Sequence, residues 1–227
     1  MATISTRIIR PVLAFAAAAG LGACASVDAV SPIEPASRNI APATTLNAPV
    51  EAPAQSVASY KVVGVTVNVP ETLRVNEANR YYPGGDIVWR EDPIGNRHEQ
   101  VRVIIQTALE KGAARVDGDQ DVIAEVSVSR FHALTEKARY TVGGVHAIQF
   151  SLRLVDAETG AVVRGPKFIK ADFEALGGQA AVRAEARGVT QKVRITDHLA
   201  YVIEQELTRP QGFVEYDNGL MGAINQL

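Results

Sequence analysis

The sequence predicts an α+β fold, with a four-stranded, mostly antiparallel sheet and two helices on one of its faces. Segments rich in β-branched residues and segments of helical periodicity follow one another in the order strand, helix, three strands, helix. Turn signals at Gly143-Gly144 and at residues 156–160 join the last three strands as hairpins. Hairpin connections make those three strands antiparallel.

The first strand covers residues 60–69. Pro70 ends it, because proline cannot donate a hydrogen bond to a sheet ladder. Four residues are expected to share one face: Val63, Val65, Val67 and Val69. The helix that follows is long enough to act as a crossover, so the first strand is expected to run parallel to the second.

The first helix covers residues 97–111. Asn96 fits its N-cap, with Glu99 three residues later as the reciprocal partner. Its apolar stripe consists of Val101, Ile104, Ile105, Ala108 and Leu109. Gly112 is expected to end the helix in the left-handed conformation.

The second strand covers residues 121–134. Its alternation breaks near Arg130-Phe131-His132, where a β-bulge would return Phe131 to the core. The chain is expected to stay extended through residues 140–142 and to turn at Gly143-Gly144. One face of the return strand is then formed by Ile148, Phe150, Leu152 and Leu154.

The last strand and the last helix complete the domain. The strand, residues 162–173, is interrupted by Gly165-Pro166 and is therefore placed at an edge of the sheet. Gly177-Gly178 leads into a helical region whose main part is residues 189–207, and Pro210 ends it. The stripe expected to face the sheet is Val193, Thr196, Leu199, Ala200, Ile203 and Leu207.

A long connection, residues 71–95, contains the first candidate binding site. It carries Tyr81, Tyr82 and Trp89, the only tryptophan, with Arg90 beside it. Tyrosine, tryptophan and arginine anchor many protein–protein interfaces, so these four residues are candidates for contact with a protein partner. The alternative is that Trp89 folds inward and covers the sheet.

The turn that follows the second strand is the second candidate. It contains Tyr140, Gly143, Gly144 and His146, and it is long and hinged by glycine. Functional residues are often carried on such loops. The alternative is an inert, protruding turn.

The sequence contains no nucleophile elbow, no zinc-protease histidine pair and no phosphate-binding loop. Glu91 and Asp92 could form an acid/base pair, but the neighbouring arginines favour a salt-bridged loop. His132 and His146 could meet across the Gly143-Gly144 turn, although two histidines without a third ligand make a poor metal site. We therefore expect no enzymatic activity, no cofactor and no metal.

The N-terminal residues predict export and a lipid anchor. Arg7 and Arg10 precede an apolar run that ends in small residues, as in a signal peptide of residues 1–23. The run is far shorter than the ~20 apolar residues of a membrane-spanning helix. Leu21-Gly22-Ala23-Cys24 resembles the lipobox of bacterial lipoproteins. The resemblance implies cleavage before Cys24, a diacylglyceryl group and further acyl chains such as palmitate on that residue, and attachment to a membrane on its periplasmic side.

Ala25, where some lipoproteins have aspartate, implies within the same resemblance an outer-membrane location. The alternative is an inner-membrane anchor that also faces the periplasm. Residues 24–57 are predicted to be the lipidated N-terminus and a Pro/Ala-rich flexible linker, since they contain few large apolar residues. A single globular domain is expected over residues 58–208, followed by an irregular C-terminal tail, residues 209–227.

The composition gives no sign of a strongly anionic partner. Without the leader the chain has 21 basic and 25 acidic residues, a net charge near −4, and it contains no run of lysine or arginine. Such a chain is not expected to bind nucleic acid or anionic lipid headgroups. Because Cys24 is the only cysteine, no intrachain disulfide can form, and packing must hold the fold together.

Three segments, residues 86–93, 130–135 and 140–146, resemble a family of uncharacterised alphaproteobacterial lipoproteins, over about residues 60–207. The family has no assigned activity. The overall architecture is more loosely similar to periplasmic accessory lipoproteins of lipid-exporting transporters and of outer-membrane assembly. That similarity implies a non-enzymatic lipoprotein that binds a protein partner in envelope assembly or lipid transport. The alternative is a carrier of a small ligand or lipid in a groove between sheet and helices; a hydrolase ranks third.

Overall fold

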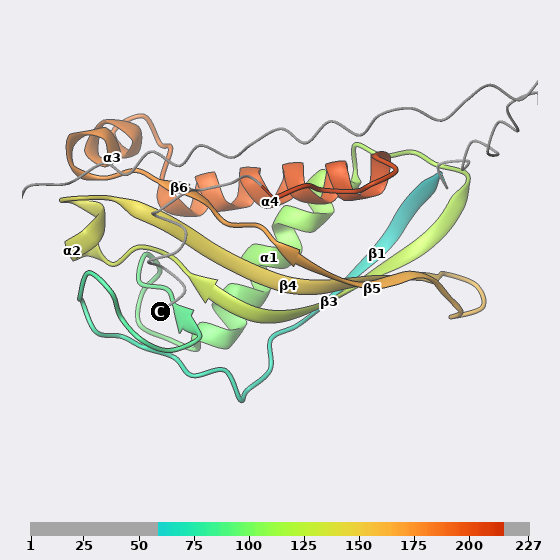
Figure 1. Ribbon diagram of the computed structural model, residues 1–227, viewed down its shortest axis with the longest axis horizontal. Coiled ribbons are helices and arrows are strands. Elements are labelled where there is room, and N and C mark those ends of the chain that lie inside the picture. Colours follow the sequence, from blue (N-terminus) through green and yellow to red (C-terminus); the bar gives the residue numbers. More distant parts are fainter. Residues whose placement is uncertain (1–58, 216–227) are drawn as a thin grey trace, which may run out of the picture. The chain divides into compact units, whose positions relative to one another are not determined.

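A computed structural model describes residues 59–215 of the chain. Six strands and four helices follow one another in this part (Figure 1). In chain order they are β1 (Tyr60–Asn68), β2 (Ile87–Val88), α1 (Arg97–Ala113), β3 (Gln120–His132), α2 (Glu136–Arg139), β4 (Gly144–Asp156), β5 (Val162–Lys170), β6 (Phe173–Ala175), α3 (Gly178–Glu185) and α4 (Gln191–Thr208). The predicted α+β class is confirmed, and the predicted number of strands is too low.

The sheet is four strands wide, in the order β1-β3-β4-β5. β1 runs parallel to β3, as predicted, whereas β4 is antiparallel to both β3 and β5. β3 and β4 have 13 residues each and their outer neighbours have 9, so each long strand extends beyond its neighbour. The short strand β2 pairs with the end of β3 that extends beyond β1, and β6 pairs with the end of β4 that extends beyond β5. These two additions account for the difference from the predicted four strands.

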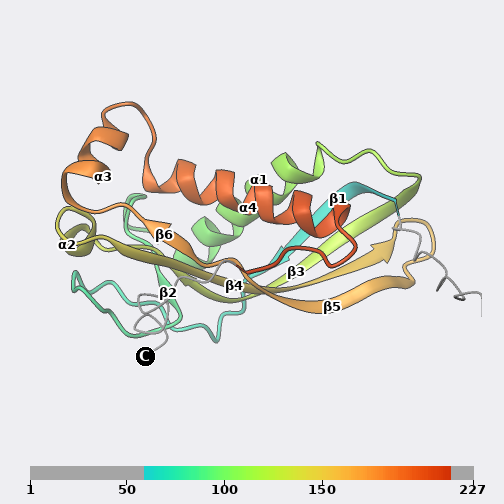
Figure 2. The ribbon, with the colours of Figure 1, turned by 45° about the horizontal axis from the view of Figure 1, so that its top comes forward.

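The core lies between the sheet and the two long helices. α1 and α4 lie on the same face of the sheet, as predicted (Figure 2). Phe131 is fully buried because the β3–β4 register shifts between Val128 and Arg130, where the sequence predicted a bulge. The alternating residues of β3 and β4 that face the helices are all buried: Val122, Ala124, Val126, Val128, Ile148, Phe150, Leu152 and Leu154.

Gly112 has a different role from the predicted one. Asn96 caps α1 as expected, and its side chain accepts a hydrogen bond from the Glu99 amide. The helix nevertheless continues through Gly112 to Ala113. A side chain at Gly112 would overlap the carbonyl oxygen of Ala200 and the side chain of Ile203, both in α4. The glycine is therefore explained by the close approach of the two helices.

The buried stripe of α4 is rotated from the predicted one. Leu199, Ala200, Ile203 and Leu207 are buried as expected. Ile195 and Val202 are also buried, whereas Val193 is 39% exposed and Thr196 is only partly buried. α4 packs against both α1 and the sheet, so its covered surface is wider than a single stripe.

The connection between β3 and β4 is partly helical rather than extended. The Thr135 side chain accepts a hydrogen bond from the Ala138 amide and so caps the single turn α2. Gly143, with φ of 76°, then leads into β4. The predicted extended segment at residues 140–142 is wrong, because local capping outweighs the extended preference of these residues.

The two outer strands also depart from the prediction. In β1, the register shifts between Val62 and Gly64, which leaves Val63 51% exposed instead of on the buried face. β5 lies at the sheet edge as expected but ends at Lys170. The side chain of Asp172 then accepts a hydrogen bond from the Ile148 amide, and Phe173 begins the separate strand β6.

The predicted signal peptide, Cys24, the linker and the end of the C-terminal tail lie outside the described residues. Within residues 59–215, no helix is both long and apolar enough to cross a membrane.

Candidate functional site

A groove of about 690 Å³ lies where β6, the beginning of β4 and α4 come together. Phe213 and Val214, which follow α4, form part of its wall. The other lining residues are Val142, Gly144, Val145, Phe173, Glu174, Ala175, Leu176, Gly177, Ala180, His198 and Tyr201. Most of these side chains are aromatic or aliphatic, and both size and lining are typical of sites for small ligands.

Two glycine pairs bring the segments of the groove together. Gly144 of β4 pairs with Ala175 of β6. A side chain at Gly177 would overlap the backbone of Gly143, and both Gly143 and Gly178 have left-handed backbone angles, with φ of 76° and 54°. The glycine pairs that the sequence identified as two separate turns therefore pack against each other.

Phe173 lies between two histidines at this site. Its ring centroid is 4.9 Å from that of His146 and 4.1 Å from that of His198, with which it is stacked. Burial lowers the pKa of His146 to about 3 and that of His198 to about 4, so both rings are neutral at pH 7. Within the described part of the chain, Nδ1 of His146 and Nε2 of His198 have no hydrogen-bond partner.

The predicted meeting of His132 and His146 does not occur. His132 stands opposite Ala147 in the β3–β4 ladder, so the side chains of His132 and His146 point to opposite faces of the sheet. Nε2 of His132 lies 2.8 Å from the carbonyl oxygen of Gly85, and burial lowers the pKa of this histidine to about 4. Residues 59–215 contain no group of three or more histidine, cysteine or acidic residues placed to hold a metal ion.

The second candidate site from the sequence, Tyr140 to His146, is part of the groove region. Gly144 lines the groove, and His146 is buried beneath it against Phe173. Tyr140 is 47% exposed, and its hydroxyl lies 3.3 Å from the Glu185 carboxylate of α3. The turn thus packs against β6 and α3.

The first candidate site is divided between core and surface. Trp89 is fully buried, packs edge-on against Phe131 at 5.8 Å, and donates a hydrogen bond from Nε1 to Asp92. Tyr81 and Tyr82 are exposed. Arg90 is turned toward Glu136, at 2.6 Å, and toward Glu77. The structure therefore shows the inward alternative for Trp89, and these four residues do not form one surface.

Glu91 and Asp92 are held by cations. Arg139 donates to Glu91 at 3.0 Å, and Lys192 donates to Asp92 at 2.7 Å. Burial alone would raise the pKa of Asp92, but hydrogen bonds from Lys192 and Trp89 leave that pKa below its ordinary value. The two carboxylates are salt-bridged, as predicted, but the cations come from α2 and α4 and not from the flanking Arg90 and Arg97.

Four residues that line the groove were missed from the sequence: Phe173, His198, Tyr201 and Phe213. They come from β6, α4 and the segment after α4, and Phe173 was assigned to the edge strand. The spacing of His198 and Tyr201 places both on one side of a helix. This spacing is the only local sequence pattern that points to the groove. The pairing of β6 with β4 cannot be derived from the sequence pattern.

Residues 60–223 match a protein family described as "Family of unknown function (DUF6778)". The chain belongs to this family. The match covers all the described elements. It confirms the predicted resemblance to a family without an assigned function. No curated protein matches this chain.

One solved structure is similar to part of the DUF6778 chain. It is a Caulobacter crescentus CB15 protein described as "a putative lipoprotein", with 20% sequence identity. The similarity covers 46% of this chain and 78% of that chain, with a TM-score of 0.29. A TM-score this low supports no conclusion about fold or function.

Proposed function

We propose that the protein is a non-enzymatic, lipid-anchored envelope protein that binds an elongated apolar ligand, such as a lipid acyl chain, in its groove. The proposed anchor is Cys24, and the proposed location is the periplasmic side of the outer membrane. The observation that carries the proposal is the apolar groove of about 690 Å³. Ligand sites usually measure about 300–1,000 Å³ and have few polar groups.

The electrostatics of the groove suit an uncharged chain. Its histidine, His198, is neutral at pH 7, and Glu174 is the only charged residue of the lining. Phe173, Tyr201 and Phe213 present aromatic surface from three segments of the chain. An acyl chain in this groove would exchange water contacts for apolar contacts without stripping water from a buried charge.

The wall that contains Phe213 is part of the folded domain. Glu206 of α4 is 1% exposed, and its carboxylate accepts a hydrogen bond from the Phe213 amide at 2.7 Å. The same carboxylate pairs with Arg164 at 2.6 Å and Lys167 at 2.7 Å, both in β5. A groove whose wall is fixed before binding loses less conformational entropy when the ligand enters.

The double variant Val142→Glu/Val214→Glu tests the proposal. Both valines line the groove and are 69% and 65% exposed, so the change adds charge without disturbing the core. We expect binding of a fluorescent long-chain fatty acid to weaken at least tenfold, because the carboxylates would have to lose water. Native mass spectrometry of the parent after gentle extraction should show a retained small molecule.

Val162→Glu is the matched control, since Val162 is 55% exposed on β5 and does not line the groove. It should bind the fatty acid like the parent. Equal binding by all three proteins, with no retained small molecule, would refute the groove as a ligand site. For the anchor, radiolabelled palmitate should enter the parent and not the Cys24→Ser variant.

A protein partner in envelope assembly or lipid transport is the second candidate. A recess of about 480 Å³ beside Arg90 is lined by charged residues and by Ile94, which is 95% exposed. A photo-crosslinker at position 94 should capture one protein of defined mass in intact cells, whereas the same group at position 162 should not. Identical products from both positions would contradict a specific contact at Ile94.

A further inference from the structure

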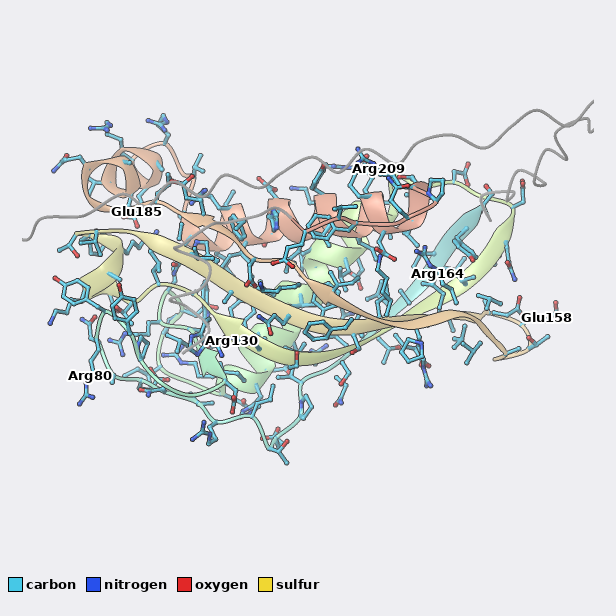
Figure 3. The ribbon with its side chains drawn as sticks, in the orientation of Figure 1. Arg80, Arg130, Glu158, Arg164, Glu185 and Arg209 are labelled. Carbon is cyan, nitrogen blue, oxygen red and sulfur yellow. The ribbon has the colours of Figure 1, made fainter. Side chains whose placement is uncertain are left out.

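We infer that the end of the domain formed by α2, α3 and residues 79–82 is a docking surface for a membrane with anionic headgroups. Side-chain contacts join the three segments. Thr135, the cap of α2, donates to the Arg80 carbonyl, and the Lys137 ammonium lies 4.7 Å from the ring centroid of Tyr81. Tyr140, after α2, is hydrogen-bonded to Glu185 of α3. Figure 3 shows Arg80 and Glu185 at this same end, in the region of α2 and α3.

Four exposed cations lie on these segments or in the turn after α3, and none has a carboxylate within 4.0 Å in the described part of the chain: Arg80, Lys137, Arg183 and Arg187. Each neighbouring carboxylate has a cationic partner, and one negative charge is left over, because Glu91 and Glu185 share Arg139. Glu136 pairs with Arg90, and both Glu91 and Glu185 pair with Arg139. Glu174, farther along β6, faces Arg194. This end of the domain therefore has unpaired positive charge, although the chain as a whole is acidic.

Apolar and aromatic side chains are exposed between these cations. Tyr81 and Tyr82 stand beside Arg80, Tyr140 follows α2, and Val182 lies next to Arg183 in α3. Tyrosine with lysine or arginine at one surface is the combination found where proteins meet the headgroup region of a bilayer. Val142, 69% exposed, belongs to this surface and also lines the groove, so a docked domain would have the groove beside the lipid.

The sequence predicted no such surface because it has no basic run. The four cations come from three segments separated by more than forty residues, and only the packing of α2 against residues 79–82 and α3 gathers them. Charge complementarity identifies the occupant as an anionic lipid surface. Docking on this surface does not require an occupied groove.

The test uses the mature chain, residues 24–227, carrying Cys24→Ser so that acyl chains do not contribute to binding. Co-sedimentation is measured with vesicles of phosphatidylcholine alone and with vesicles that also contain phosphatidylglycerol. We expect binding to the anionic vesicles only, and loss of that binding in about 0.5 M salt. Arg183→Gln/Arg187→Gln should weaken it on the order of 10- to 30-fold, since each cation near the surface contributes.

The matched control is Lys61→Gln/Arg209→Gln. It removes two exposed cations, one in β1 and one at the end of α4 (Figure 3 labels Arg209), and neither forms an ion pair with another described residue. This control should bind like the parent, and Tyr81→Ala/Tyr82→Ala should bind more weakly. Circular dichroism of each variant checks the fold. Binding to neutral vesicles at equal strength, no binding to either vesicle, or an equal loss in the control would overturn the inference. If the protein still binds vesicles after losing its groove ligand, the docking surface and the proposed ligand site are independent.

Discussion

Trp89 and Tyr82 lie in the same connection, yet their environments are opposite. Trp89 is fully buried against Phe131, and its indole donates to Asp92, whereas Tyr82 is 66% exposed. The strand β2, Ile87–Val88, pairs with β3 and carries Trp89 into the core. Residue type alone suggested a shared interface, and the position relative to β2 decides which aromatic residue is structural.

Trp89→Ala should therefore lower the free energy of unfolding by about 3–5 kcal/mol, as expected for a large buried aromatic residue. Tyr82→Ala should change it by less than about 0.5 kcal/mol, because its side chain is mostly in water. Urea denaturation of both variants measures the difference. A Trp89→Ala protein as stable as the parent would contradict the buried position.

The buried histidines predict a loss of stability in mild acid. His146 stays neutral in the folded protein down to a pKa of about 3, whereas an unfolded histidine titrates near 6.5. Between these values the unfolded chain binds more protons, so the free energy of unfolding falls as pH decreases from 6.5. His132 and His198, with pKa values of about 4, add to the effect.

Between pH 6.5 and pH 5, the free energy of unfolding of His146→Gln should fall by about 2 kcal/mol less than that of the parent, because one histidine no longer takes up a proton on unfolding. Denaturant unfolding at the two pH values provides the measurement. If the parent and the variant lose the same stability, His146 is not buried in its neutral form.

At the scale of elements, the contact of α1 with α4 depends on Gly112. Intrinsic helix propensity favours alanine over glycine by about 1 kcal/mol. A methyl group at Gly112 would overlap the carbonyl of Ala200, and overpacking costs about 1–3 kcal/mol. Gly112→Ala is therefore expected to destabilise the protein. Gly84→Ala, which meets nothing within 4 Å, is the control and should leave the melting temperature unchanged.

The elements predicted best are those in which a long periodic pattern coincides with burial. The stripe of α1 and the alternation in β3 and β4 extend over many residues, and tertiary packing agrees with them. The connections were predicted less well. α2 depends on one cap, Thr135, and β6 has three residues, so neither leaves a pattern long enough to recognise. The groove was missed for the same reason, because β6 forms one of its walls.

At the scale of the whole molecule, residues 59–215 share one hydrophobic core, and the residues before them are rich in proline and alanine. We expect limited proteolysis of the mature chain to converge on a fragment that begins in about residues 50–60, because such a composition cannot bury enough apolar surface to order itself. Mass spectrometry of the digest gives the boundary. Early cleavage inside α1 or β3 instead would contradict a single folded unit.

The sequence by itself determined the α+β class, the long elements and the expectation of a lipid anchor at Cys24, because these depend on local periodicity and on a short contiguous motif. Only the tertiary structure decided that Trp89 is buried, that Phe173 lies between His146 and His198, and that four separated cations meet at one end. These features depend on strand register and on packing between distant segments. Contacts between distant residues are set by the free energy of the whole fold, which no single segment encodes.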